Sequence, residues 1–194
     1  MKHSRHLGFA SLLALAAMAL FSVGTASATT LEVGGVAKNS SVAVAMSLAS
    51  GTSLIIKDEF GTTTDTCTSS ETSFSTESPF TATEVSGTVQ SWTFANCSHP
   101  TIVIKKGWAI QKVLSGTRSD YFSLLAEVTI QSTFFGASAI CKTGLGTTWG
   151  EYTGVSSGKG KVDIKGYLDC GILGTASWTG TYTVTSPEGL GVVN

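Results

Sequence analysis

The stretch Phe94–Ile104 brings together Cys97, His99 and Pro100, a combination whose first two side chains could do chemistry. A thiol and an imidazole this close could bind a metal ion or act as nucleophile and general base. The other two of the three histidines fall in the leader segment described below, so any Ser-His-Asp triad must use His99. Pro100 favours an extended backbone at His99, as in a loop after a strand. We therefore interpret the stretch as a strand, a turn and a second strand, and we predict no catalytic residue.

The sequence gives no stronger indication of a metal site or a bound cofactor than it does of a catalytic residue. The spacing C-x-H is not a standard zinc pattern, and neither C-x-x-C nor H-E-x-x-H occurs. The loop "KDEFGTTTD" offers Asp58, Glu59 and Asp65 as oxygen ligands for calcium, but it lacks the alternation of a dedicated calcium loop. No G-x-S-x-G elbow and no nucleotide or flavin fingerprint is present. The sequence thus predicts a protein that is not an enzyme, with no metal and no cofactor.

Two alternatives depend on carboxylates and aromatic rings: a glycosidase and a protein that binds a ligand through exposed rings. A glycosidase needs two carboxylates around a bond, and Glu127, Asp163 and Asp169 alternate with apolar residues on predicted strands. We interpret these three as solvent-facing. Trp149 and Tyr152, in the predicted loop "GTTWGEYTG", are candidate ligand or interface aromatics, or they anchor that loop onto the core.

The first 28 residues predict the compartment. Two basic residues precede an apolar run at 7–23, and small residues at 26–28 fit a signal peptidase site. We predict a signal peptide at 1–28 and a single secreted β domain at 29–194, located outside the cell or at a bacterial cell surface. The mature chain is expected to have no transmembrane segment.

The charge of the mature chain argues against nucleic acid as a partner. The leader takes two of the 12 basic residues and none of the 13 acidic ones, so 10 basic and 13 acidic residues leave a net charge of −3. Nucleic-acid binding needs clustered Lys and Arg. Charged residues make up 13% of the chain, about half the usual share. Ser, Thr and Gly take their place, a composition typical of an extracellular β protein.

Four cysteines, Cys67, Cys97, Cys141 and Cys170, all lie in the mature part. An even number in an oxidising compartment predicts two disulfides. We favour Cys67–Cys97 and Cys141–Cys170, because each links neighbouring segments; the two other connectivities remain open. Each favoured bridge would stabilise the fold by roughly 3–4 kcal/mol on a chain-entropy estimate.

Apolar residues alternate with small or polar ones in many short runs. Examples are "SVAVAMSLA", "SWTFAN", "LLAEVTIQS", "KVDIKGYLDC" and "ASWTGTYTVTS". Period-two alternation buries one face of a strand, and clusters of Gly, Ser, Thr and Asn between the runs predict turns. The predicted fold is all-β: an antiparallel β-sandwich or closed barrel of many short strands, held by two disulfides.

Two windows without charge predict surface behaviour. Residues 128–141 and 42–49 would pair edge to edge if they were exposed. Lysines on neighbouring strands, such as Lys105, Lys161 and Lys165, would guard against this pairing. Low charge and amphipathic strands therefore predict adsorption at apolar surfaces or self-association.

The chain also resembles a known family. The likeness is carried by "TLEVGGVAKNSSVAVAMSLASGTSL", "GTTTDTCTSS", "FFGASAICKTGLGT" and "LDCGILGTASWTGTYTVTSPEGLGVVN". These motifs are similar to those of the secreted bacterial protein activator of alkane oxidation family, over nearly the whole mature chain. The resemblance implies a small extracellular protein that assists the oxidation of long-chain alkanes at the cell or droplet surface. It implies no catalytic residue.

These observations predict a non-enzymatic secreted protein that assists the use of hydrophobic substrates at the cell or oil–water interface. Its expected partners are hydrophobic surfaces or long-chain alkanes. One alternative is a matrix, biofilm, adhesin or fibre subunit that assembles by strand pairing through Val42–Ala49. A second alternative is a carbohydrate-binding module, which would expose Trp149 and Tyr152.

Overall fold

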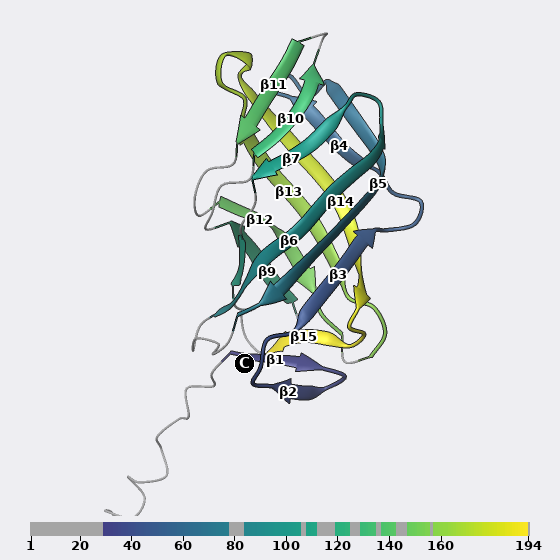
Figure 1. Cartoon of the computed structure of the whole chain (residues 1–194), viewed down its shortest axis with the longest axis vertical. Helices are drawn as coiled ribbons and strands as arrows, with labels where there is room; N and C mark the ends of the chain where they lie inside the picture. The colour runs from purple at the N-terminus through teal and green to yellow at the C-terminus, as the bar shows by residue number, and fades with distance from the viewer. Residues whose placement is uncertain are drawn as a thin grey trace, which may run out of the picture.

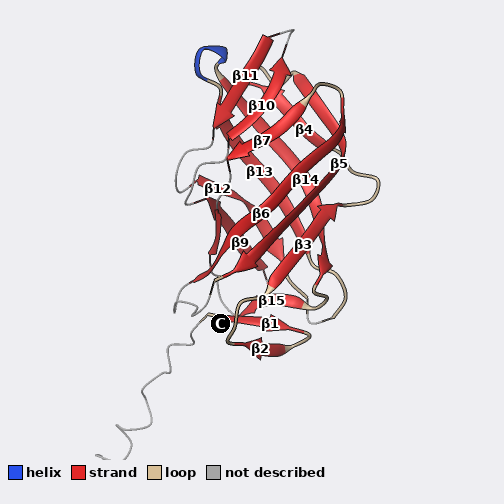
Figure 2. Cartoon of the chain, in the orientation of Figure 1, coloured by secondary structure: helices blue, strands red, loops and turns tan. Residues whose placement is uncertain are grey.

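The computed structural model describes residues 29–77, 84–105, 108–111, 119–124, 129–134, 137–142, 147–155 and 157–193. Strands fill most of these ranges, and one short 3-10 turn, η1 (Gly171–Leu173), is present (Figure 2). The strands are β1 (Thr30–Val33), β2 (Val36–Lys38), β3 (Ala43–Leu48), β4 (Leu54–Asp58), β5 (Thr63–Thr76), β6 (Glu84–Cys97), β7 (Thr101–Lys105), β8 (Trp108–Gln111), β9 (Ser119–Leu124), β10 (Thr129–Phe134), β11 (Ala137–Lys142), β12 (Thr147–Thr153), β13 (Lys161–Asp169), β14 (Thr175–Ser186) and β15 (Leu190–Val193).

The pairings of the larger sheet close on themselves. Within the described ranges the order β14–β4–β5–β6–β8–β9–β12–β13 returns to β14, and every pairing in it is antiparallel. The wall with β5 and β6 lies in front of the wall with β13 and β14, as the layers of a sandwich do (Figure 1). The prediction of an all-β antiparallel fold is confirmed, and the complete circuit makes it a closed barrel.

Several positions in the barrel wall are shared by two collinear strands. Both β3 and β4 lie between β14 and β5 and run in the same direction, so they form one interrupted strand. The uninterrupted strands are long: β5 and β6 have 14 residues each and β14 has 12. The expectation of many short strands is wrong for these three, in which the strand continues through runs of Ser and Thr, as in "TCTSSETSFS".

The core lies inside the barrel, because apolar residues alternate with polar ones along each strand. In β13 every second residue is buried, and Lys161, Asp163 and Lys165 face outward between them. Val44 and Met46 of β3 and Trp178, Tyr182 and Val184 of β14 are buried as their alternation predicted. An eight-stranded barrel has an interior that side chains can just fill, and these residues fill it.

A small sheet in the order β15–β1–β2 lies across the lower end of the barrel (Figure 1). Its buried side chains Leu31, Leu190 and Val192 extend the core. The hydroxyl of Tyr152 donates to the carbonyl of Leu190 over 2.7 Å, and the Val155 amide donates to the same carbonyl over 3.0 Å. These two hydrogen bonds join β12 and its following loop to the small sheet, which therefore closes this end.

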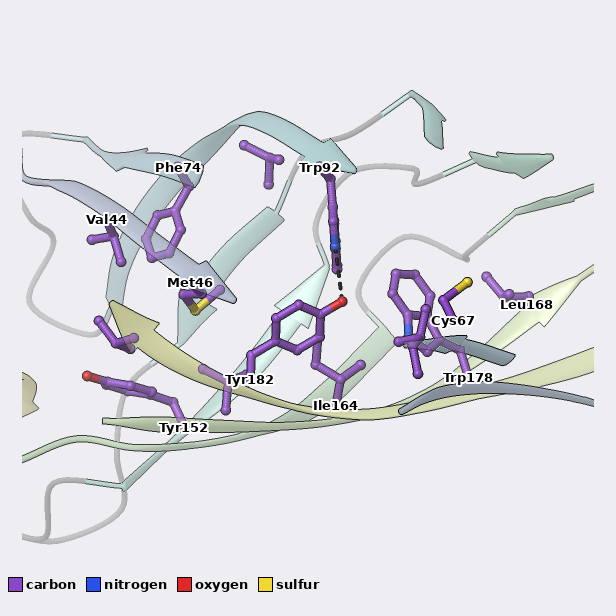
Figure 3. Close-up of a cluster of buried hydrophobic side chains, with 14 of the residues drawn as sticks. Val44, Met46, Cys67, Phe74, Trp92, Tyr152, Ile164, Leu168, Trp178 and Tyr182 are labelled. Atoms are coloured by element: carbon purple, nitrogen blue, oxygen red, sulfur yellow. Dashed lines mark hydrogen bonds between the residues drawn. The ribbon is translucent and has the colours of Figure 1, made fainter. Parts of the chain in front are cut away.

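Aromatic rings from opposite walls meet in the interior (Figure 3). The ring centroids of Trp92 and Trp178 lie 4.9 Å apart, and those of Phe94 and Trp178 lie 5.5 Å apart. The Trp92 indole N–H donates to the Tyr182 hydroxyl over 3.3 Å, and this hydroxyl donates to Ser70 Oγ over 2.8 Å. The Ser70 hydroxyl in turn donates to a backbone carbonyl of β6, so a directed relay connects β5, β6 and β14 across the barrel.

Both predicted disulfides are present: Cys67–Cys97 and Cys141–Cys170. Cys67 and Cys97 lie directly opposite each other on β5 and β6. The second bridge joins β11 to the residue that follows β13. Sequence separations of 30 and 29 correspond to roughly 3–4 kcal/mol of stabilisation for each bridge on the chain-entropy estimate.

The predicted signal peptide, residues 1–28, lies outside the described residues. Among the residues that are described, no helix has the length and apolar character needed to cross a membrane.

The interior relay predicts a loss of stability in alkali. Burial raises the pKa of Tyr182 to about 12, and hydrogen bonds with Ser70 and Trp92 offset part of that rise. Above pH 10 the unfolded chain loses this proton while the folded chain keeps it. The contribution of Tyr182 to the free energy of unfolding is therefore fully present below pH 10 and is lost between pH 10 and 12. The expected loss is about 2–3 kcal/mol.

Urea unfolding at pH 8, 10 and 11.5 measures this loss, with Tyr182→Phe as the control. At pH 8 the variant is less stable by about 1–2 kcal/mol because the Trp92 and Ser70 hydrogen bonds are lost. Its further decline in alkali is smaller than that of the wild type. An equal alkaline decline in both proteins would contradict the assignment to Tyr182.

Candidate functional site

The stretch that first suggested chemistry forms the connection between β6 and β7. Strand β6 ends at Cys97, residues 98–100 turn, and β7 begins at Thr101, as predicted. Asp65, with a fully buried side chain, organises the turn. One of its carboxylate oxygens accepts hydrogen bonds from the Thr66 amide at 2.8 Å, the Ser98 hydroxyl at 2.7 Å and the His99 amide at 3.0 Å. Its other oxygen accepts from the Thr101 hydroxyl.

Serine, histidine and aspartate thus meet at this turn, a grouping that sequence reasoning missed. The geometry differs from that of a catalytic triad, in which the imidazole lies between the nucleophile and the carboxylate. Here Ser98 donates directly to Asp65, and His99 Nδ1 lies 3.8 Å from the same carboxylate oxygen and 3.4 Å from Ser98 Oγ. The Ser98 proton is directed at the carboxylate, so the arrangement holds the turn. The residues concerned are 33 or 34 positions apart in sequence, and only the β5–β6 pairing brings them together.

The candidate metal ligands separate in the structure. Asp58 Oδ1 accepts from the amides of Phe60 and Thr62, at 3.0 and 2.8 Å, and so caps the β4–β5 turn. Asp65 faces the β6–β7 turn instead, so the two do not form a common calcium loop. Among the described residues, the ligand-type group that comes together is Asp65, Cys67 and Cys97. Both sulfurs in this group are consumed by their disulfide.

The carboxylates considered for glycoside hydrolysis lie on the outer wall. Asp163 and Asp169 both project outward from β13. Asp163 accepts a hydrogen bond from the Thr181 hydroxyl at 2.6 Å, and Asp169 accepts from the Gly171 amide at 2.8 Å. Glu127 lies outside the described residues.

The loop predicted around Trp149 and Tyr152 is wrong, because Thr147–Thr153 form strand β12. This strand pairs with β9 and β13, and its alternation turns Tyr152 into the core. Tyr152 is 1% exposed, so it anchors the small sheet and presents no ring to a ligand. Trp149 belongs to β12, and its side chain lies outside the described part of the structure.

The alternative of assembly by strand pairing through Val42–Ala49 required this segment to be an exposed edge, which it is not. Within the described residues β3 pairs with β14 on one side and with β5 on the other. Barrel closure occupies the backbone groups on both sides of this segment, and a second chain cannot extend the sheet there.

Large apolar side chains are exposed at the upper end of the barrel. In an up-and-down barrel alternate connections lie at the same end, and this end carries the β4–β5, β6–β7 and β13–β14 connections (Figure 1). The exposed fractions range from 45% for Leu173 to 103% for Ile172. We define these side chains as the apolar rim: Phe60, Ile102, Ile140, Ile172 and Leu173.

Two loops of the rim are held side by side. Gly174 has a φ of 78°, and a Cβ added there would lie 2.7 Å from a carboxylate oxygen of Glu59. The positive φ favours glycine at this position, and the Glu59 side chain of the β4–β5 turn lies beside it. The Cys170 amide donates to the Gly174 carbonyl at 2.9 Å, and the disulfide at Cys170 fixes the base of the loop. Ile172 is therefore displayed on a closely hydrogen-bonded turn.

The two remaining rim residues, Ile140 of β11 and Ile102 of β7, lie on either side of β10. Gln131 of β10 pairs with Ile140 of β11 on one side and with Ile102 of β7 on the other. The three residues form one row across the sheet, with neighbouring strands about 4.8 Å apart. A hollow of about 360 Å³ lies beside this row and is lined by residues 94–102 at the fork between β6 and β7. Half-buried Phe94 lines the hollow and contacts Trp178 of the core.

Comparison with known proteins adds no relative to this description. No protein-family model, no curated protein and no solved structure matches the chain.

The role of Asp65 predicts a large cost for its replacement. In Asp65→Asn, an amide group takes the place of one acceptor oxygen, so a hydroxyl or amide donor at the turn faces another donor. We expect the free energy of unfolding to fall by about 2–3 kcal/mol. Urea unfolding with intact disulfides measures this change.

The matched control is Asp163→Asn, which replaces an exposed carboxylate that accepts one hydroxyl hydrogen bond. This change is expected to cost less than about 1 kcal/mol. Equal shifts for the two variants would contradict the organising role of Asp65.

Proposed function

We propose that this protein is a non-enzymatic secreted protein that adsorbs at apolar–water interfaces and so assists the oxidation of long-chain alkanes. The apolar rim is the observation that carries the proposal. Its five side chains are at least 45% exposed and gather at one end of the barrel: Phe60, Ile172 and Leu173 are on connections, and Ile102 and Ile140 are on strands β7 and β11. An oil droplet or a hydrophobic cell surface would bury them without any change in fold.

The energetics favour attachment through this end. Burying a large aliphatic or aromatic side chain contributes about 1.5–3 kcal/mol, so several rim residues together offset the loss of freedom on adsorption. The outward residues of β13 include Lys161, Asp163, Lys165 and Asp169, which oppose burial of the wall in oil. The contrast between rim and wall supports an end-on attachment.

The two disulfides support the same proposal. Two disulfides suit an oxidising compartment, where an oil droplet or a cell exterior is accessible. The resemblance to the alkane oxidation activator family is independent of the rim and indicates the same kind of substrate. Contact between cell and droplet is the step that such a protein would promote, while oxidation itself belongs to a separate enzyme.

Replacing rim residues tests the proposal. In the triple variant Phe60→Ser, Ile172→Ser, Leu173→Ser, the affinity for oil is expected to fall at least tenfold, because three exposed apolar groups are lost. The measurement is the protein concentration that gives half the maximal decrease in tension at a hexadecane–water interface, from pendant-drop tensiometry.

The matched control is Val36→Ser, which removes a side chain that is 60% exposed on β2, at the opposite end of the barrel. This variant is expected to match the wild type. The proposal fails if the wild type leaves the tension unchanged, or if the rim variant and the control behave alike. Growth on hexadecane of a deletion strain carrying each variant then tests the link to alkane use.

A further inference from the structure

A groove with hydroxyl side chains on its floor runs along the outer face of β14, and its upper end adjoins the β4–β5 turn that carries Phe60 of the apolar rim. Its upper part has a volume of about 340 Å³ and lies between β4 with its following turn on one side and β13 on the other. A second hollow of about 340 Å³ continues it downward, and the two share Lys165 and Thr179. The outward residues of β14 form the floor: Thr175, Ser177, Thr179 and Thr181. Six residues of strand separate the first from the last, which makes the floor about 20 Å long.

Strand register explains why a groove forms there. Ser177 lies between Lys57 of β4 and Tyr167 of β13, and Thr179 lies between Ile55 and Lys165. Short hydroxyl side chains in the central strand are thus flanked by longer side chains on both neighbours. The difference in side-chain length hollows the surface along β14.

The floor hydroxyls are available to a ligand. Some exposed hydroxyls on the barrel are paired, as in Ser73 with Ser91 at 2.6 Å. Thr181 is also engaged, because it donates to Asp163. Within the described part of the chain, the hydroxyls of Thr175, Ser177 and Thr179 make no hydrogen bond to another group. They form a row of donors and acceptors at a spacing of about 6.6 Å.

One wall of the groove carries an aromatic ring. Tyr167 is 63% exposed, in contrast to the buried Tyr152 and Tyr182. An exposed ring beside a row of hydroxyls offers both an apolar face and hydrogen bonds. The charged residues of the upper groove balance, since Lys57 and Lys165 oppose Asp58 and Glu59.

We propose that this groove binds an extended, uncharged polysaccharide chain. The face of a sugar ring would stack on Tyr167, and the sugar hydroxyls would exchange hydrogen bonds with the floor. The groove carries no excess of positive charge, which disfavours a polyanion. The groove lies on the flank of the barrel and meets the apolar rim at its upper end, so one molecule could hold a polysaccharide along its flank and an apolar surface at its end.

Affinity electrophoresis tests the proposal. The protein runs in native gels that contain hydroxyethyl cellulose, mixed-linkage β-glucan, galactomannan or the polyanion alginate. We expect at least one of the three neutral polysaccharides to retard the wild type, with little retardation by alginate. In Tyr167→Ala the apparent dissociation constant is expected to rise about tenfold, because ring stacking is lost. In Thr179→Val the constant also rises, because the hydroxyl is lost while the shape is kept.

Two controls separate this site from the apolar rim. Thr183→Val changes a threonine on the same strand and face, beyond the groove, and should bind as the wild type does. Ile140→Ser, at a rim residue on β11 that does not line the groove, should keep full retardation, whereas its contribution to oil adsorption is lost. The inference is overturned if no neutral polysaccharide retards the wild type, if alginate alone does so, or if Tyr167→Ala and Thr179→Val bind as tightly as Thr183→Val.

Discussion

Closure of the barrel at β14 is the constraint on which the rest of the structure depends. This strand pairs with β13 on one side and with β3 and β4 on the other, so it joins the last part of the wall to the first. Once the circuit is complete, period-two alternation sends every second side chain inward. Trp178 and Tyr182 of the same strand then meet Trp92 from the opposite wall. Strand pairing and interior packing therefore depend on each other.

Closure also determines where apolar side chains can remain exposed. The outer face of β13 carries charged residues, and the small β15–β1–β2 sheet covers the lower end. The connections at the upper end are held by Asp65 and by the two disulfides. The rigid turns of this end present Phe60 and Ile172 to the surroundings, and this asymmetry is the physical basis of the proposed attachment to oil.

Much of the fold could be predicted from the sequence, because its determinants are local. Alternation identified the buried faces around Val44, Trp178 and Val162, and cysteine spacing indicated both bridges. Contacts between distant segments were not predictable in this way. Asp65 was read with Asp58 as part of one loop, but strand pairing carries it to Ser98. Trp149 and Tyr152 were assigned to a loop because of the glycines and threonines around them, although neighbouring strands stabilise β12. The rim and the groove arise from strand order and register, which composition does not reveal.

Side-chain footprinting on oil droplets tests end-on attachment most directly. Hydroxyl radicals label exposed aromatic and aliphatic side chains, and mass spectrometry compares the protein in buffer with the protein on hexadecane droplets. The account predicts strong protection of Phe60, Ile172 and Leu173 on the droplet, with unchanged labelling of Val36 on β2 and Tyr167 on the wall. Equal protection of Val36 and Phe60, or protection of Tyr167 with the rim still labelled, would contradict it.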